Sequence, residues 1–207
     1  MVRRDIEARG ISDPRILAAM RHVPRERFIG RRWRDKAYDD GALPISARQT
    51  ISQPYVVAWM IDSLRLSDDA RVLEIGTGSG YGAAVLAEVA GEVVTVERLV
   101  MLADQARALL DELGYRNVAV VVGDGTLGHA ARAPYDGICV TAAAPEVPPT
   151  LLRQLAPGGR LVMPVGGRDG QELTIVAHEG DQFPRTVVGG VRFVPLIGEQ
   201  GWDEEGS

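Results

Sequence analysis

Three groups of residues in this sequence have the types and spacing to bind a small molecule. The first is a glycine-rich turn that reads E-I-G-T-G-S-G from Glu74 to Gly80. Glycine permits backbone conformations that bring main-chain N–H groups close to a ligand. A run of aliphatic residues precedes the turn and a helical pattern follows it, which is where open α/β sheets bind nucleotides. The candidate ligand-binding residues of the turn are Glu74, Gly76, Thr77, Gly78, Ser79 and Gly80.

The other two groups contain acids that follow neighbouring predicted strands. Glu97 and the adjacent Arg98 end the next strand along the chain, and Gly123-Asp124-Gly125 follows the strand after that. An acid about 20 residues beyond a glycine turn accepts hydrogen bonds from ribose hydroxyls, and Asp124 can accept one from an exocyclic amine. The carboxyl ends of parallel strands meet at one edge of a sheet, so the three groups together predict a nucleoside site. The alternative for each acid is a helix cap or a turn residue.

The spacing of the glycines distinguishes between nucleoside cofactors. Dinucleotide sites use G-x-G-x-x-G, with the pyrophosphate at the helix N-terminus. Here Gly76, Gly78 and Gly80 give G-x-G-x-G, which resembles the first motif of class I methyltransferases, whose loop wraps the phosphate-free amino-acid part of the cofactor. That resemblance implies S-adenosyl-L-methionine as cofactor and S-adenosyl-L-homocysteine as product. A nicotinamide-dependent oxidoreductase is the first alternative, and the glycine spacing argues against it.

Over most of its length the chain resembles the protein-L-isoaspartate (D-aspartate) O-methyltransferase family. The glycine loop is common to many methyltransferases, whereas the Gln49–Tyr55 and Thr141–Pro145 segments are much more specific to this family. The matching segments are Gly10–Asp13, Val23–Glu26, Leu43–Ile45, Gln49–Tyr55, Val72–Tyr81, Gly123–Gly125, Ala133–Asp136, Val140–Pro145, Gly158–Val162 and Val194–Leu196.

The resemblance implies an activity and roles for individual residues. The family methylates the free carboxylate of isoaspartyl residues in damaged proteins, after which the ester collapses to a succinimide and repeated cycles restore aspartate. Ser52 matches the family's catalytic serine, and Glu97 and Asp124 match the positions that hold the ribose and the adenine. The implied partners are therefore isoaspartyl-containing proteins and peptides. The implied substrate-side residues are Arg48, Gln49, Thr50, Ile51, Gln53, Pro54, Tyr55, Thr141, Ala142 and Ala143.

Ser52 also has a structural interpretation that does not need the family. It stands two residues before Pro54 at the head of a helical pattern, where N-cap serines are common. Position alone favours a cap, and only the resemblance favours catalysis. The two roles are compatible, because a hydroxyl at a helix N-terminus can also position a carboxylate oxygen.

Two positions depart from the family pattern. The family reads Leu-Pro-Ile-Gly-x-Gly before Gln-Thr-Ile-Ser, and here Ser46 and Arg48 replace both glycines. Arg48 can clamp a carboxylate through two parallel hydrogen bonds, or it can narrow the cleft. An alternative within the family therefore stays open, namely a relative that methylates one aspartate of a ribosomal peptide and so triggers imide formation.

Methyl transfer to a carboxylate makes few demands on the protein. The acceptor is ionised at pH 7, so the site must mainly align oxygen, methyl carbon and sulfur and exclude water. The sequence accordingly lacks a Ser-His-Asp or Cys-His pattern, since His22, His129 and His178 are scattered. Cys139 lies in a predicted buried strand, where thiols are inert. We expect no metal ion.

Composition and charge limit the remaining function classes. The 207 residues are 45% hydrophobic and 25% charged, with net charge −5. Residues 1–36 carry ten arginines and Lys36 against five acids, which fits a solvated helix face or, alternatively, a nucleic-acid methyltransferase or binding module. No amine-methylating N-P-P-Y-type motif or aromatic stacking run supports that alternative, so we expect no nucleic-acid partner. The single cysteine favours a reducing cytoplasm, and without a long apolar run we expect no membrane partner. We also expect a monomer.

The elements that must position these residues alternate in type. Strands are expected at 72–75, 93–96, 118–122, 138–140 and 160–164, with helices from Pro14, from Pro54, over 81–90 and over 102–113. Leu151, Leu152 and Leu155 predict a short helix closed at 157–159. Two further strands, 173–176 and 186–196, are expected antiparallel at the sheet edge. The result is one α/β domain over 1–207 with a three-layer, Rossmann-like methyltransferase fold, in which a helical and loop cap (1–66) carries Gln49–Tyr55 and the sheet core (67–207) binds the cofactor.

Overall fold

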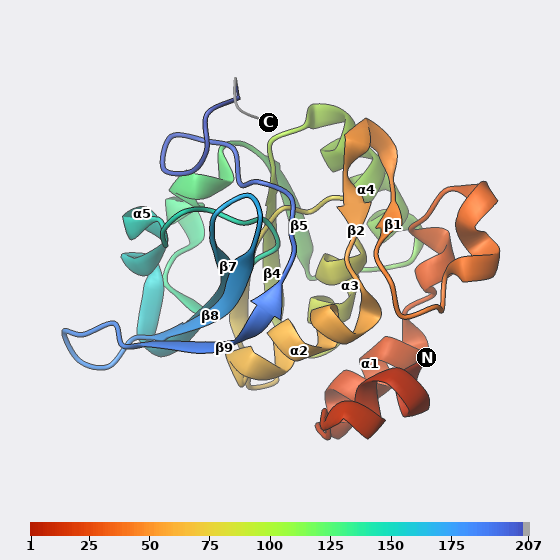
Figure 1. Ribbon diagram of the computed structural model, residues 1–207, viewed down its shortest axis with the longest axis horizontal. Coiled ribbons are helices and arrows are strands. Elements are labelled where there is room, and N and C mark those ends of the chain that lie inside the picture. The colour runs from red at the N-terminus through yellow and green to blue at the C-terminus, as the bar shows by residue number, and fades with distance from the viewer. Residues whose placement is uncertain (205–207) are drawn as a thin grey trace.

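The computed structural model describes residues 1–204 and places a mostly parallel sheet at the centre of the molecule (Figure 1). The strands in this sheet are β3 (Arg71–Ile75), β4 (Glu92–Glu97), β5 (Val118–Val122), β6 (Tyr135–Val140), β7 (Leu155–Gly166), β8 (Gln171–Ala177) and β9 (Arg185–Val191). Over the described residues their order is β5-β4-β3-β6-β7-β8-β9. Strands β3 to β7 pair in parallel, and β8 and β9 are antiparallel at one edge. The predicted fold class is confirmed.

Helices connect the strands and cover the sheet. They are α1 (Pro14–His22), α2 (Pro54–Leu64), α3 (Tyr81–Ala87), α4 (Val100–Glu112) and α5 (Pro149–Leu152). Proline begins α1 and α2, where its missing N–H costs nothing, and the Asp13 carboxylate accepts a 2.8 Å hydrogen bond from the Arg15 N–H at the start of α1.

The core has two halves because successive strand residues point to opposite faces. Val72 and Val93 pack with α1, α2 and α3, whereas Leu73, Val94 and Ile138 pack with α5 on the other face. All five side chains are fully buried. Burial of each contributes about 1.5–3 kcal/mol, which fixes the strand ends from which the site residues project.

Besides α1, the chain before α2 consists of short helical turns and one small hairpin. Its helical pieces are η1 (Val2–Ile6), η2 (Glu7–Arg9), η3 (Arg25–Arg27), η4 (Arg31–Lys36) and η5 (Ser46–Arg48). The hairpin pairs β1 (Leu43–Pro44) with β2 (Thr50–Ile51) and leads directly into α2. Two more single turns, η6 (Gly125–Leu127) and η7 (Ala130–Arg132), follow β5. The division of the chain into a cap and a core at residue 66 remains a prediction.

Three predicted boundaries are wrong. Helix α3 ends at Ala87 rather than residue 90, because the Asn117 amide nitrogen donates to the carbonyls of Ala87 and Ala90 at 2.9 and 3.2 Å. Leu155 and the turn residues 157–159 belong to β7, where the Gly158 N–H bonds to the His178 carbonyl at 2.9 Å.

The third wrong boundary concerns the C-terminal strand. Strand β9 ends at Val191, and the chain beyond it leaves the sheet edge. There the Ala143 N–H donates to the Val194 carbonyl, and the Leu196 N–H donates to the Ala143 carbonyl, at 2.8 and 2.7 Å. This segment therefore crosses the rim where the parallel strands end.

Candidate active site

The glycine turn joins β3 to α3 in a conformation that needs glycine. Gly76, Gly78 and Gly80 have φ of 94°, 53° and 89°, which L side chains rarely adopt. The Thr141 hydroxyl donates to the Ile75 and Gly76 carbonyls at 3.0 and 2.8 Å, so a Cβ on Gly76 would overlap that hydroxyl. The predicted loop and Thr141 are thus brought together at the end of β3.

Glu97 lies at the end of β4 and braces the loop from the side. Its Oε2 accepts a hydrogen bond from the Gly78 N–H at 2.9 Å, and its Oε1 accepts one from the Leu99 N–H at 3.0 Å. Each carboxylate oxygen keeps a further lone pair, which leaves room for a ribose hydroxyl. Arg98 next to it is exposed and pairs with Glu204 at 2.9 Å.

Glu74 lies beneath the loop, away from solvent. The Thr95 hydroxyl donates to its Oε2 at 2.6 Å, and the Thr77 and Thr95 hydroxyls lie 2.6 Å apart. Burial raises the pKa of Glu74 to about 8, with Thr95 opposing the shift and Glu97 adding to it. Glu74 therefore supports the loop through two threonines, and its predicted contact with the cofactor remains a prediction. Ser79 Oγ lies 3.4 Å from the Tyr81 N–H at the start of α3.

Asp124 performs the capping role that the sequence left as an alternative. Its Oδ1 accepts hydrogen bonds from the Thr126 N–H and hydroxyl at 2.8 and 2.7 Å, which caps η6. Its Oδ2 accepts a hydrogen bond from the Glu199 N–H at 2.8 Å. Asp124 thus ties the end of β5 to the C-terminal segment, and its bond to an adenine amine remains a prediction.

A cavity lies where these strand ends meet and is also lined by the β1–β2 hairpin. Its walls include the loop, Glu97, Arg98, Gly125, Thr141 and Ala142, all of which the sequence singled out. Gln49 and Thr50 of the hairpin close it from above. Residues Val194–Ile197 form a further wall that sequence reasoning missed, because it assigned 186–196 to a strand in the sheet.

Ser52 stands between a second cavity and an open groove. The cavity adjoins the loop at Gly76 and Gly78 and has an apolar side made by Val57 and Met60 of α2. The groove runs past Gln53 and Val56 to residues 190–194 and also includes Ser52. Among the described residues, the Ser52 hydroxyl has no hydrogen-bond partner. A hydroxyl in this place can reach ligands that enter from either side.

The expectation that Ser52 caps α2 is wrong. Pro54 takes the first helical position, so Gln53 becomes the N-cap residue, and its side chain makes no capping bond. The Tyr55 N–H instead donates to Asp40 Oδ1 at 3.1 Å. The acceptor for this helix end therefore comes from the loop before the hairpin, which leaves the Ser52 hydroxyl free.

The remaining substrate-side residues differ in how deeply they are buried. Ile51, Pro54, Ala142 and Ala143 are buried, and of these Ile51 and Ala142 line the cavities. Gln49 Nε2 donates to the Ala47 carbonyl at 3.3 Å. Arg48 is exposed on the hairpin turn and is absent from the walls of all three spaces described above.

Two charged residues beside the site were not singled out from the sequence. The sequence analysis gave Asp40 no role, and it included Arg25 only within the family segment Val23–Glu26. Both contact the Ser52–Tyr55 segment. Neither has a local pattern that reveals its hydrogen-bond partners, which lie 12 to 31 residues away.

The described part of the chain contains neither a cluster of metal ligands nor a membrane-spanning helix. Within residues 1–204 no three or more histidine, cysteine, aspartate or glutamate side chains gather closely enough to hold a metal ion. No helix in the same range has both the length and the apolar character needed to cross a membrane. Cys139 is a buried free thiol, and burial raises its pKa.

Comparison with known proteins agrees with this geometry. A Rhodopseudomonas palustris protein-L-isoaspartate O-methyltransferase is 56% identical over 99% of this chain and 94% of its own. A relative of the same name from Methanoregula boonei is 54% identical over 98% of this chain and 94% of its own.

Two solved structures share the fold. One, a protein-L-isoaspartate O-methyltransferase, matches with TM-score 0.88 and 32% identity over 94% of this chain, which spans 64% of that longer chain. A Plasmodium falciparum protein solved with S-adenosyl-L-homocysteine has TM-score 0.79 and 23% identity, over 95% of this chain and 96% of its own. The model of the protein-L-isoaspartate (D-aspartate) O-methyltransferase family matches residues 1–201, and the chain belongs to that family.

Proposed function

We propose that this chain methylates the free carboxylate of L-isoaspartyl and D-aspartyl residues in damaged proteins, with S-adenosyl-L-methionine as the donor. The observation that carries the proposal is the place of Ser52 between the cavity beside the glycine loop and the open groove. The groove offers an entry for a peptide, and the cavity beside the glycine loop, which shares Gly76, Gly78 and Thr141 with the one under the hairpin, offers one for the cofactor. A methyl group passed from one to the other crosses the position of this hydroxyl.

The reaction is an in-line displacement at the sulfonium methyl of the cofactor. A carboxylate oxygen attacks, the carbon–sulfur bond breaks, and S-adenosyl-L-homocysteine leaves with the bonding pair. The acceptor is already ionised at neutral pH, so the protein supplies alignment and exclusion of water rather than a strong base. The Ser52 hydroxyl donates a hydrogen bond that holds the carboxylate in line, and the N-terminus of α2 favours the negative charge there.

A methyl-transfer assay on matched peptides tests the substrate. Three synthetic peptides differ only in whether one residue is L-isoaspartyl, L-aspartyl or D-aspartyl. We expect kcat/KM to be highest for the L-isoaspartyl peptide and measurable for the D-aspartyl one. Preference for ordinary L-aspartyl peptide would reject damage repair and favour a dedicated aspartate methyltransferase.

The variant Ser52→Ala tests the site. Loss of a positioned hydrogen-bond donor should lower kcat on the order of 100-fold. The Kd for S-adenosyl-L-homocysteine, from calorimetric titration, should stay within about twofold, because the hydroxyl contacts the acceptor rather than the cofactor. Since Ser52 does not cap α2, the melting temperature should change little. Unchanged turnover would remove Ser52 from the mechanism.

The proposal extends to where the chain works. The buried, unpaired thiol of Cys139 suits a reducing compartment, so we propose the cytoplasm. We further propose that the chain acts as a monomer. Cell fractionation and sedimentation analysis of the purified protein test these two statements.

A further inference from the structure

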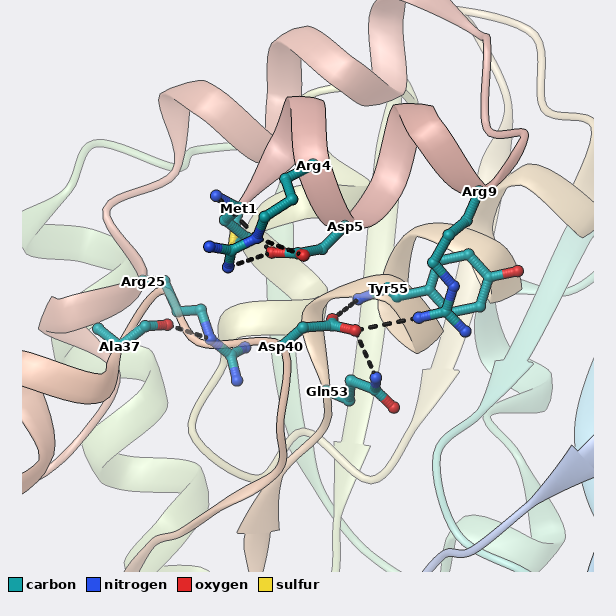
Figure 2. A network of polar contacts seen from close by, with 9 residues as sticks. All are labelled: Met1, Arg4, Asp5, Arg9, Arg25, Ala37, Asp40, Gln53 and Tyr55. Atoms are coloured by element: carbon teal, nitrogen blue, oxygen red, sulfur yellow. Dashed lines mark hydrogen bonds and ion pairs between the residues drawn. The ribbon is translucent and has the colours of Figure 1, made fainter.

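The backbone around Ser52 is held by two charges that belong to neither the cofactor cavity nor the peptide groove. Arg25 and Asp40 both lie in the loop-rich segment before the hairpin, and Figure 2 shows them beside the start of α2. Their contacts involve Ser52 itself and the residues that follow it.

Arg25 holds the Ser52 backbone through a hydrogen bond to its carbonyl. Its side chain is 0% exposed, and its Nη2 donates to the Ser52 carbonyl at 2.8 Å. Its Nε donates to the Ala37 carbonyl at 2.9 Å, and the guanidinium lies over the Tyr81 ring at 4.7 Å from the centroid. Tyr81 opens α3 directly after the glycine loop. Arg25 thus joins the segment that carries Ser52 to the helix that follows the cofactor loop.

Asp40 holds the residues on the other side of Ser52. Its Oδ2 accepts from Gln53 Nε2 at 2.6 Å and from Arg9 Nη1 at 3.0 Å, and its Oδ1 accepts from the Tyr55 N–H at 3.1 Å (Figure 2). Arg9 lies over the Tyr55 ring, 3.3 Å from its centroid. The Asp40 side chain is only 18% exposed, so water competes weakly for its hydrogen bonds.

The negative charge of Asp40 helps to offset the cost of burying the Arg25 guanidinium. Burial lowers the pKa of Arg25, and the negative charge of Asp40 is among the influences that oppose this. A buried guanidinium is costly unless hydrogen bonds and a counter-charge compensate it. Arg25 Nη1 is buried and has no partner among the described residues, so the compensation rests on the carbonyls, the Tyr81 ring and Asp40.

We infer that Asp40 and Arg25 are positioning residues for the Ser52 hydroxyl: they fix the backbone before and after it and so set where the hydroxyl stands between cavity and groove. This inference rests on the proposed role of Ser52. Loss of the contacts made by either residue lets the hydroxyl move relative to the methyl group of the cofactor. A misplacement of about 1 Å costs on the order of 100-fold in rate.

Adjacent aspartates provide a matched test. Asp40→Ala removes all three bonds, whereas Asp39→Ala removes an exposed carboxylate that has no hydrogen bond or ion pair among the described residues. We expect Asp40→Ala to lower kcat on isoaspartyl peptide 10- to 100-fold, as orders of magnitude, with KM for the cofactor within about twofold. Asp39→Ala should keep wild-type kinetics. Asp40→Asn should recover part of kcat, because its amide oxygen can still accept from the Tyr55 N–H.

Combination with Ser52→Ala separates positioning from a merely structural role. If Asp40 acts through Ser52, Asp40→Ala should lower kcat little further in the Ser52→Ala protein. An equal fall in both backgrounds, or unchanged kcat with only a lower melting temperature, overturns the inference while leaving the proposed function intact. Wild-type turnover in Ser52→Ala alone rejects the role of Ser52 and the inference with it.

Discussion

Glu74 is a carboxyl group placed beneath the glycine loop, where water does not reach it. Its charge would need to be balanced there, and only the Thr95 hydroxyl bonds to it among the described residues. Its pKa is therefore high, and the group holds its proton at neutral pH. A neutral Glu74 avoids burying an uncompensated charge beneath the loop, where Glu97 already accepts a hydrogen bond from the Gly78 N–H.

Glu74→Gln should change how stability depends on pH. The folded protein keeps a proton up to about pH 8 that the unfolded chain loses near pH 4.5. The free energy of unfolding contributed by Glu74 is therefore greatest below that range and falls as pH rises through it, by up to about 1.4 kcal/mol per pH unit. Glutamine does not titrate, so the wild type should lose stability relative to Glu74→Gln between pH 5 and pH 8 as measured by urea unfolding. A difference between the two proteins that stays constant, or that grows in favour of the wild type from pH 5 to pH 8, would show that Glu74 is ionised when folded. Asp35→Asn, at an exposed carboxylate, serves as control.

At the scale of elements, the β1–β2 hairpin has a strained turn. Ala47 and Arg48 have φ of 55° and 57°, a left-handed conformation that glycine adopts without cost. The family pattern has glycine at 46 and 48, and only the second of these two positions is left-handed here. The hairpin covers the cavity beside the glycine loop, and its turn keeps a left-handed conformation at the expense of strain in this chain.

Arg48→Gly should relieve that strain. We expect a gain of about 1 kcal/mol in stability, visible as a higher melting temperature. Because Arg48 is exposed and outside the walls of the site, isoaspartyl activity should be kept or raised. Ser46→Gly is the matched control, since position 46 is not left-handed, and it should bring no gain. Loss of isoaspartyl activity in Arg48→Gly would assign the guanidinium to substrate binding.

Gly78→Val tests the loop that joins β3 to α3. A side chain at this φ of 53° is strained, and its Cβ would lie 3.6 Å from Ile45 Cδ1 of the hairpin. The added side chain would also stand on the loop beside which we propose that the cofactor binds. Calorimetric titration should show at least a roughly tenfold loss of affinity for S-adenosyl-L-homocysteine. Gly114→Val is the control, because Gly114 has φ of 88° but open space around it.

The wild type should not bind NAD; tight NAD binding would contradict the cofactor assignment.

At the scale of the whole molecule, Asp124 connects parts of the chain that are distant in sequence. Through Thr126 and Glu199 it fastens the C-terminal segment to the end of β5. The Trp202 indole N–H donates to the Ala143 carbonyl at 3.1 Å and fastens the same segment to the end of β6. The wall formed by Val194–Ile197 is thus held from two strands of the sheet.

Asp124→Ala should therefore weaken cofactor binding. Loss of its bonds should cost about 1–3 kcal/mol, shared between fold stability and affinity for S-adenosyl-L-homocysteine. Glu199→Ala is the control, because the bond to Asp124 uses the main chain of Glu199. Calorimetric titration beside melting curves measures both quantities. An unchanged affinity with a sharply lower melting temperature would leave Asp124 with a capping role alone.

The sequence predicted what local rules determine. The glycine loop, Glu97 and the alternation of strands and helices follow from periodicity and from the special conformations of glycine, and all lie where expected. Asp40 as the acceptor for α2 could not be predicted, because its partners depend on how a long loop folds back. The path of residues 192–196 was misassigned for a related reason: its apolar residues fit a strand, but tertiary contacts with Ala143 draw it across the rim.

The hydrogen bonds of Arg25 have a consequence for how this chain can change over time. The guanidinium binds carbonyl oxygens of Ala37, Gly41 and Ser52, and every amino acid supplies a carbonyl. Substitutions at the first two positions leave these acceptors in place, whereas an inserted or deleted residue between them would move one out of reach. We therefore expect homologous chains to vary more freely in residue type than in length between Ala37 and Ser52.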